Sequence, residues 1–165
     1  MNTLFFILTL TTFSPNAALC PSQTFDKADI AMDTLTSWRA VDDFYTRYRN
    51  CDDGYILEGT SDRIARLLVD EWYRLEELSP LIKARPPLAD YILSHISTYT
   101  DKEDLEKLQF LSSSQCKIAN QKFCERLHFA TVLALKEQFN EEKEPPDKDK
   151  RIGPDNYQPM SLDAV

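Results

Sequence analysis

Apolar residues recur along most of this chain at spacings of three and four positions, which places their side chains on one face of a helix. No stretch alternates apolar and polar residues for long, as a half-buried strand would. The chain contains only three glycines, few for a fold built from strands and tight turns. The pattern therefore predicts an all-α protein, an irregular bundle of five or six short helices.

Helix-breaking and capping residues divide this pattern into elements. Ser79-Pro80 is typical of a helix start, Pro86-Pro87 of the boundary between two helices, and Thr100 with Glu103 of a capping box. In the first helix, Ile30 and Trp38 fall on the predicted buried side. We expect helices over residues 30–48 and 62–78, after Ser79-Pro80, after Pro86-Pro87, from residue 100 to about 111, and from about 117 to beyond 135.

The first eighteen residues have the order of a secretory signal. An apolar run over residues 4–10 is followed by the helix breaker Ser14-Pro15 and then by the small residues Ala17 and Ala18. The run is far shorter than the ~20 apolar residues that cross a bilayer. We therefore predict a signal peptide over residues 1–18, a periplasmic or secreted protein, and no stable membrane insertion after cleavage.

Residues 19–140 are predicted to form one helical domain, and residues 141–165 a disordered acidic tail, because that end is rich in charge and proline. The formal net charge of the chain is −8. This charge argues against nucleic-acid binding and against attachment to an anionic membrane, since both require a basic surface. The negative net charge suits binding to another protein, and a basic surface on that protein would be complementary to it.

All four cysteines lie beyond the predicted signal peptide, and an even number in an exported chain indicates two disulfides, with three possible pairings. On one straight helix, Cys116 and Cys124 would lie about 12 Å apart, too far to bond. They can bond only if Cys116 precedes that helix, after a loop at Ser112-Ser113-Ser114. We favour Cys116–Cys124 and Cys20–Cys51. No zinc-binding spacing of cysteine and histidine occurs.

Residues 51–63 are the most distinctive segment, with four acidic residues and two of the three glycines. A structural explanation of the acidic residues is that Asp52 or Asp53 caps a helix. The two glycines would then let another part of the backbone approach closely. If the segment is helical, Glu58 and Asp62 lie one turn apart, and this repulsion calls for compensation by Arg63 or Arg66.

Three interpretations of this segment compete, and we favour the capped, internally hydrogen-bonded helix start. The second is a partner-binding surface made of Asp52, Asp53, Tyr55, Glu58, Ser61 and Asp62. The third is catalysis, with Asp52 or Asp53 and Glu58 roughly 5–9 Å apart as an acid–base pair acting on a glycan. Calcium binding stays open, although the spacing does not match an EF-hand loop.

In this segment the chain resembles a group of small exported bacterial proteins of uncharacterised function. They share a Cys-Asp-Asp-Gly-x3-Glu-Gly-x-Ser-Asp stretch, an Arg-Leu-Leu-x3-Trp continuation and a late cysteine pair. Here these motifs are residues 51–62, residues 66–72, and Cys116 with Cys124. The resemblance implies an exported, mainly helical domain and supplies no activity.

The catalytic motifs that we sought do not occur in the sequence: G-x-S-x-G, a Walker loop, H-E-x-x-H and a dinucleotide fingerprint. Both histidines, His95 and His128, sit beside apolar residues on predicted helices, and we expect them at a helix surface or half-buried. We predict no cofactor and no catalytic residue. The leading hypothesis is a non-enzymatic binding protein, inhibitor-like or immunity-like; the alternatives are a small envelope hydrolase and a structural envelope protein.

Overall fold

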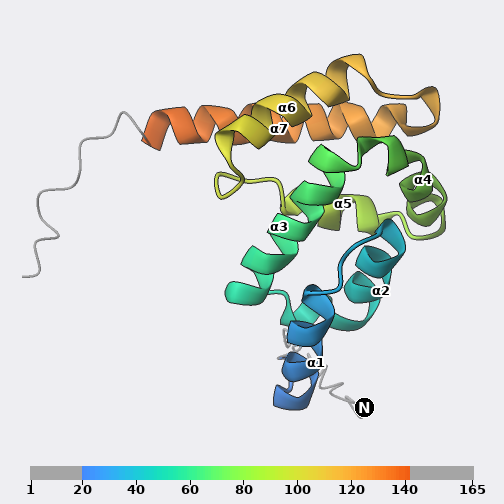
Figure 1. Ribbon diagram of the computed structural model, residues 1–165, viewed down its shortest axis with the longest axis vertical. Coiled ribbons are helices and arrows are strands. Elements are labelled where there is room, and N and C mark those ends of the chain that lie inside the picture. Colours follow the sequence, from blue (N-terminus) through green and yellow to red (C-terminus); the bar gives the residue numbers. More distant parts are fainter. Residues whose placement is uncertain (1–19, 142–165) are drawn as a thin grey trace, which may run out of the picture.

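The computed structural model describes residues 20–141, and these form seven α-helices joined by short connections and three single 3-10 turns (Figure 1). The all-α class is therefore confirmed, and no strand occurs between residues 20 and 141. The predicted signal peptide and the predicted tail beyond residue 141 lie outside the described residues. The helices are α1 (Ser22–Met32), α2 (Trp38–Tyr48), α3 (Tyr55–Asp70), α4 (Leu75–Ala84), α5 (Pro87–Ser94), α6 (Lys102–Ser114) and α7 (Gln121–Glu141).

The number of helices between residues 20 and 141 is larger than the predicted five or six, because two helices occupy the region of the first predicted one. It was expected over residues 30–48, but α1 ends at Met32 and α2 begins at Trp38. Ser37 caps α2, since its hydroxyl oxygen accepts a hydrogen bond from the Ala40 amide at 3.2 Å. Ile30 is 69% exposed, so its expected place in the core was wrong, whereas Trp38 is fully buried.

The second predicted helix is also displaced. Helix α3 begins at Tyr55, seven residues before the expected start, and ends at Asp70. Helix α4 begins at Leu75 and contains Pro80, so Ser79-Pro80 does not start a helix as predicted. The Ser79 hydroxyl instead donates to the carbonyl of Ala119 at 3.3 Å, a tertiary contact that the local sequence does not reveal.

Two further boundary predictions were wrong and one is confirmed. Pro87 opens α5, as expected. The capping box is absent, because Asp101 precedes the first residue of α6 and makes no side-chain cap there, while Thr100 accepts from the Ser97 amide. Helix α6 runs on through Ser114, so the predicted serine loop is helical and Cys116 lies in the connection that follows.

Both predicted disulfides are confirmed. Cys20–Cys51 joins the start of α1 to the 3-10 turn before α3, with 4.9 Å between the Cα atoms. Cys116–Cys124 joins the α6–α7 connection to the first turns of α7, with 6.2 Å between the Cα atoms. Each disulfide therefore fastens the segment that leads into a long helix.

In Figure 1, α6 and α7 lie side by side across one end of the molecule, α1 and α2 form the other end, and α3 connects the two. The core is continuous from end to end, and its largest buried side chains include Trp38, Phe44, Ile64, Leu68 and Leu127. Gly59 leaves room for the Met32 side chain of α1 against α3, because a Cβ atom at Gly59 would overlap the sulfur of Met32. These contacts hold α3, which carries the distinctive segment, between both ends of the protein.

Candidate functional site

A surface groove of about 660 Å³ lies beside α3. Its other walls are the end of α5, the connection between α5 and α6, and the start of α6. We call it the acidic groove. It is lined by Asp53, Gly54, Leu57, Glu58, Ser61, Asp62, Ala65, Ser94, Ser97, Tyr99, Thr100, Asp101 and Asp104.

Helical spacing explains the α3 wall of the acidic groove. Leu57, Glu58, Ser61, Asp62 and Ala65 follow one another at intervals of three and four positions and so share one helix face. The chain enters this helix through Gly54, whose φ of +55° and ψ of −132° are disfavoured for residues with a side chain beyond hydrogen. Because α3 already begins at Tyr55, Glu58 and Asp62 lie one turn apart in a continuous helix.

The groove is strongly negative, because five carboxylates line it and no basic residue does. Arg66 pairs with Asp104 at the edge of the groove. Glu58, Asp62 and Asp101 form no ion pair with any residue between 20 and 141. Neither candidate arginine forms an ion pair with Glu58 or Asp62, since Arg63 lies 3.9 Å from Asp33 and Arg66 binds Asp70 and Asp104.

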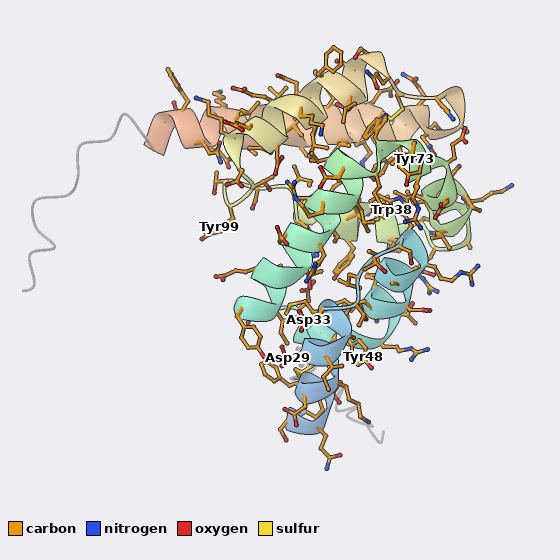
Figure 2. All side chains as sticks on the ribbon, viewed as in Figure 1. Asp29, Asp33, Trp38, Tyr48, Tyr73 and Tyr99 are labelled. Carbon is orange, nitrogen blue, oxygen red and sulfur yellow. A yellow bond between two sulfur atoms is a disulfide. The ribbon has the colours of Figure 1, made fainter. Side chains whose placement is uncertain are left out.

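Apolar side chains accompany the acids. Leu57 is 37% exposed and Tyr99 is 88% exposed. Figure 2 shows Tyr99 projecting outward from the α5–α6 connection. Carboxylates beside exposed aliphatic and aromatic groups can contact both the charge and the carbon stem of a lysine or arginine side chain.

A buried polar network lies behind the α3 wall and consists of Asp52, Ser61, Tyr91 and His95. The Tyr91 hydroxyl donates to Oδ2 of Asp52 at 2.6 Å, and Nε2 of His95 lies 3.1 Å from the same oxygen. Nδ1 of His95 lies 2.9 Å from the Ser61 hydroxyl oxygen. The side chains of Asp52 and His95 are 4% and 1% exposed. Since Ser61 also lines the acidic groove, the network connects the groove to the core.

Aromatic contacts hold this network in place. The rings of Tyr91 and His95 pack edge to face with 4.6 Å between centroids, and Tyr45 packs on Tyr91 at 4.9 Å. Burial, followed by the negative charge of Asp52, raises the pKa of the Tyr91 phenol above its ordinary range. Tyr91 therefore keeps its proton, and continues to donate to Asp52, at a pH where an exposed tyrosine ionises.

Replacing Tyr91 with phenylalanine is expected to change how stability depends on alkaline pH. The native state retains the Tyr91 proton that the unfolded chain loses above about pH 10, so its contribution to the unfolding free energy is present below that pH and declines above it. The wild type should therefore lose about 1.4 kcal/mol per pH unit more than Tyr91→Phe above that pH. Urea unfolding of both proteins between pH 8 and about 11.5 measures this, and parallel pH profiles would contradict it.

Ser61, His95 and Asp52 lie in the order of nucleophile, base and orienting carboxylate that acyl transfer uses. The Ser61 hydroxyl also donates to the carbonyl of Leu57 at 2.7 Å, within α3. Ser61 lies in the second turn of a 16-residue helix, where backbone amides are used by the helix and do not stabilise an oxyanion. The Ser61 hydroxyl is therefore better suited to hold His95 against α3 by a hydrogen bond than to act as a nucleophile.

The structure brings four of the six predicted binding residues into the acidic groove: Asp53, Glu58, Ser61 and Asp62. Asp52 is turned inward to the buried network. Tyr55 is 50% exposed and packs edge-on against Phe25 of α1, with 5.6 Å between ring centroids. Partial desolvation and the neighbouring carboxylate of Asp29 raise the pKa of the Tyr55 phenol. Tyr55 therefore belongs to the contact between α1 and α3.

Sequence reasoning missed the second wall of the groove and the burial of His95. That wall comes from residues 94–104, far along the chain from the α3 wall at residues 57–65, and no local motif marks it. The expectation that His95 is exposed or half-buried was wrong, because its ring packs against Tyr91, lies beside Asp52 and hydrogen-bonds Ser61 inside the protein. The spacing of Tyr91 and His95, one helical turn apart, was the available signal for their contact.

The chain matches no protein-family model, no curated protein and no solved structure. Between residues 20 and 141, no three His, Cys, Asp or Glu side chains are placed to hold a metal ion together. Within the same residues, each helix is too short or too polar to pass through a bilayer.

Proposed function

We propose that this protein is an exported, non-enzymatic binding protein that acts by protein–protein contact, and that the acidic groove receives a basic segment of its partner. The observation that carries this proposal is the groove itself, in which Glu58, Asp62 and Asp101 have no cationic partner within the described chain. Unpaired carboxylates in a concave surface favour a cationic ligand and speed its encounter.

Rigidity of the groove supports the same proposal. Its α3 wall is fixed on the buried side by the contact between Ser61 and His95, and Met32 of α1 packs against the same helix at Gly59. A surface that is already in its binding conformation loses little conformational entropy on association. An inhibitor-like or immunity-like role, in which one protein occludes another, requires such a surface.

The predicted signal peptide and the two disulfides support an extracytoplasmic location, in the bacterial periplasm or outside the cell. Disulfides persist in oxidising compartments and are rare in the cytosol. An exported inhibitor of an envelope-targeting toxin would meet its partner there.

The proposal is tested with three oxidised proteins: the wild type, the groove variant Glu58→Lys/Asp62→Lys, and the control variant Asp43→Lys/Glu106→Lys. The control changes the net charge equally, at exposed acids outside the groove. Partners are captured from bacterial envelope extract at physiological salt, and their affinities are then measured by calorimetry. We expect the groove variant to bind at least about tenfold more weakly, because like charges then face one another across the contact, and the control to bind like the wild type.

Equal binding by all three proteins would contradict the role of the groove, and failure of the wild type to capture any partner would contradict the binding function. The hydrolase alternative is tested by incubating the wild type and Glu58→Gln with cell-wall glycan. Turnover by the wild type that Glu58→Gln abolishes would replace our proposal with that alternative.

A further inference from the structure

A second groove, of about 580 Å³, lies where the amino end of α7 meets α4, and it shares no residue with the acidic groove. We call it the α4–α7 groove. In Figure 1 the start of α7 lies beside α4. The Cys116–Cys124 disulfide ties the connection before α7 to the first turns of that helix. The lining of the groove includes Ser79 and Lys83 of α4, Asn120, and Gln121, Lys122 and Glu125 of α7.

The amino end of α7 supplies hydrogen-bond donors for an anion. The first amides of an α-helix have no partner inside the helix, and they carry the positive end of the helix dipole. Helix α7 is 21 residues long, and its first three residues, Gln121, Lys122 and Phe123, all line the α4–α7 groove. Helix ends of this kind bind phosphate groups in many proteins.

A buried amide beside this helix end indicates a ligand independently of the helix dipole. Asn120 directly precedes α7, lines the α4–α7 groove and is only 6% exposed. Its side-chain nitrogen Nδ2 has no hydrogen-bond acceptor among residues 20–141. Because a buried N–H group without an acceptor is costly, a ligand oxygen that accepts from Asn120 is favoured.

Two lysines give the α4–α7 groove a positive charge in a chain whose net charge is −8. Lys83, in the last turn of α4, and Lys122 are both exposed, and neither forms an ion pair between residues 20 and 141. Glu125 is the one carboxylate among the described lining residues, and it accepts a hydrogen bond from Nε2 of Gln121 at 3.0 Å. These groups match an anion that has several acceptor oxygens and more than one negative charge.

We propose that the α4–α7 groove binds a phosphate group, either as free phosphate or as a phosphate monoester. The Asn120 amide and the first amides of α7 donate to the phosphate oxygens, and Lys83 and Lys122 balance the charge. A carboxylate has fewer oxygens and a single charge, so it uses this set of donors less fully. Because the two grooves are separate, one molecule can bind phosphate and a basic partner together.

NMR titration of the isotope-labelled, oxidised full chain with inorganic phosphate, at constant ionic strength, tests the proposal. We expect saturable shifts that are concentrated at the backbone amides of Gln121, Lys122 and Phe123 and at the side-chain amide of Asn120. Chloride should produce no such pattern, because a single ion offers no set of separate acceptor oxygens to these donors.

Three variants of the α4–α7 groove and one control make the test specific. Asn120→Asp replaces the donor with a carboxylate of nearly the same shape, and aspartate suits the position before a helix as well as asparagine does. Asn120→Asp and Lys122→Gln should each weaken phosphate binding at least about tenfold, because each removes a donor to a charged ligand. Glu125→Gln should strengthen it, because a negative charge leaves the lining. The matched control Lys27→Gln removes an exposed lysine from α1 and should bind like the wild type.

Glycerol phosphate in the same titration distinguishes the two sources of the ligand. Binding of both probes assigns the site to a phosphate group carried by a larger molecule, and binding of inorganic phosphate alone assigns it to the free ion. Circular dichroism establishes that each variant is folded. The absence of saturable shifts with either probe overturns the proposal, as does unchanged binding by Asn120→Asp or an equal loss of binding in Lys27→Gln.

Discussion

Replacing Asp52 with alanine is expected to lower the free energy of unfolding by about 3 kcal/mol or more. One carboxylate oxygen accepts from Tyr91 and faces His95, and both partners are held inside the protein. Without Asp52, the buried Tyr91 hydroxyl loses its acceptor and Nε2 of His95 loses the carboxylate oxygen that lies 3.1 Å away, and burying polar groups without partners is costly. Urea unfolding at pH 7 measures the loss.

The neighbouring carboxylate provides the matched control. Asp53 is exposed and faces the acidic groove, so Asp53→Ala should change the unfolding free energy by about 0.5 kcal/mol or less. Asp52→Asn keeps an acceptor for Tyr91 and should fall between the two. If Asp52→Ala and Asp53→Ala unfold at the same urea concentration, the buried network contributes nothing to stability.

Removing the Cys20–Cys51 disulfide is expected to lower the free energy of unfolding by about 3–4 kcal/mol. The two cysteines are 31 positions apart, so the bond excludes many conformations of the unfolded chain. Cys116 and Cys124 are only eight positions apart, and their removal should cost about 2–3 kcal/mol. Chemical denaturation of Cys20→Ala/Cys51→Ala and Cys116→Ala/Cys124→Ala without reductant compares the two.

The loop-length argument requires this order of stabilities. If removing the shorter loop costs more, local packing at the start of α7 determines the effect rather than the entropy of the unfolded chain. Reductant supplies the control, because it should destabilise the Cys20→Ala/Cys51→Ala variant only by the amount that Cys116–Cys124 contributes.

The helical class could be predicted because it depends on local information, and once Cys116 is paired with Cys124 the other two cysteines can only pair with each other. Amphipathic spacing is a property of neighbouring residues, and loop geometry constrained the Cys116–Cys124 pair. Predicted helix boundaries were wrong where the expected capping residue hydrogen-bonds to another partner. Ser79 binds the carbonyl of Ala119 instead of capping a helix, and Thr100 accepts from Ser97 instead of starting α6.

The acidic groove was half predictable for the same reason. Glu58, Ser61 and Asp62 share a face of one helix, and sequence spacing alone places them together. Tyr99, Asp101 and Asp104 join them only because the α5–α6 connection folds against α3. Burial of His95 depends on residues from three segments meeting in the core, which no local pattern expresses.

The order of the disulfides has a consequence for biosynthesis. Each cysteine pairs with the next one along the chain, 20 with 51 and 116 with 124. A polypeptide that is oxidised as it emerges from a translocation channel, amino end first, would meet the correct partner for each thiol before any wrong one. Maturation of this protein should then need an oxidase but no disulfide isomerase.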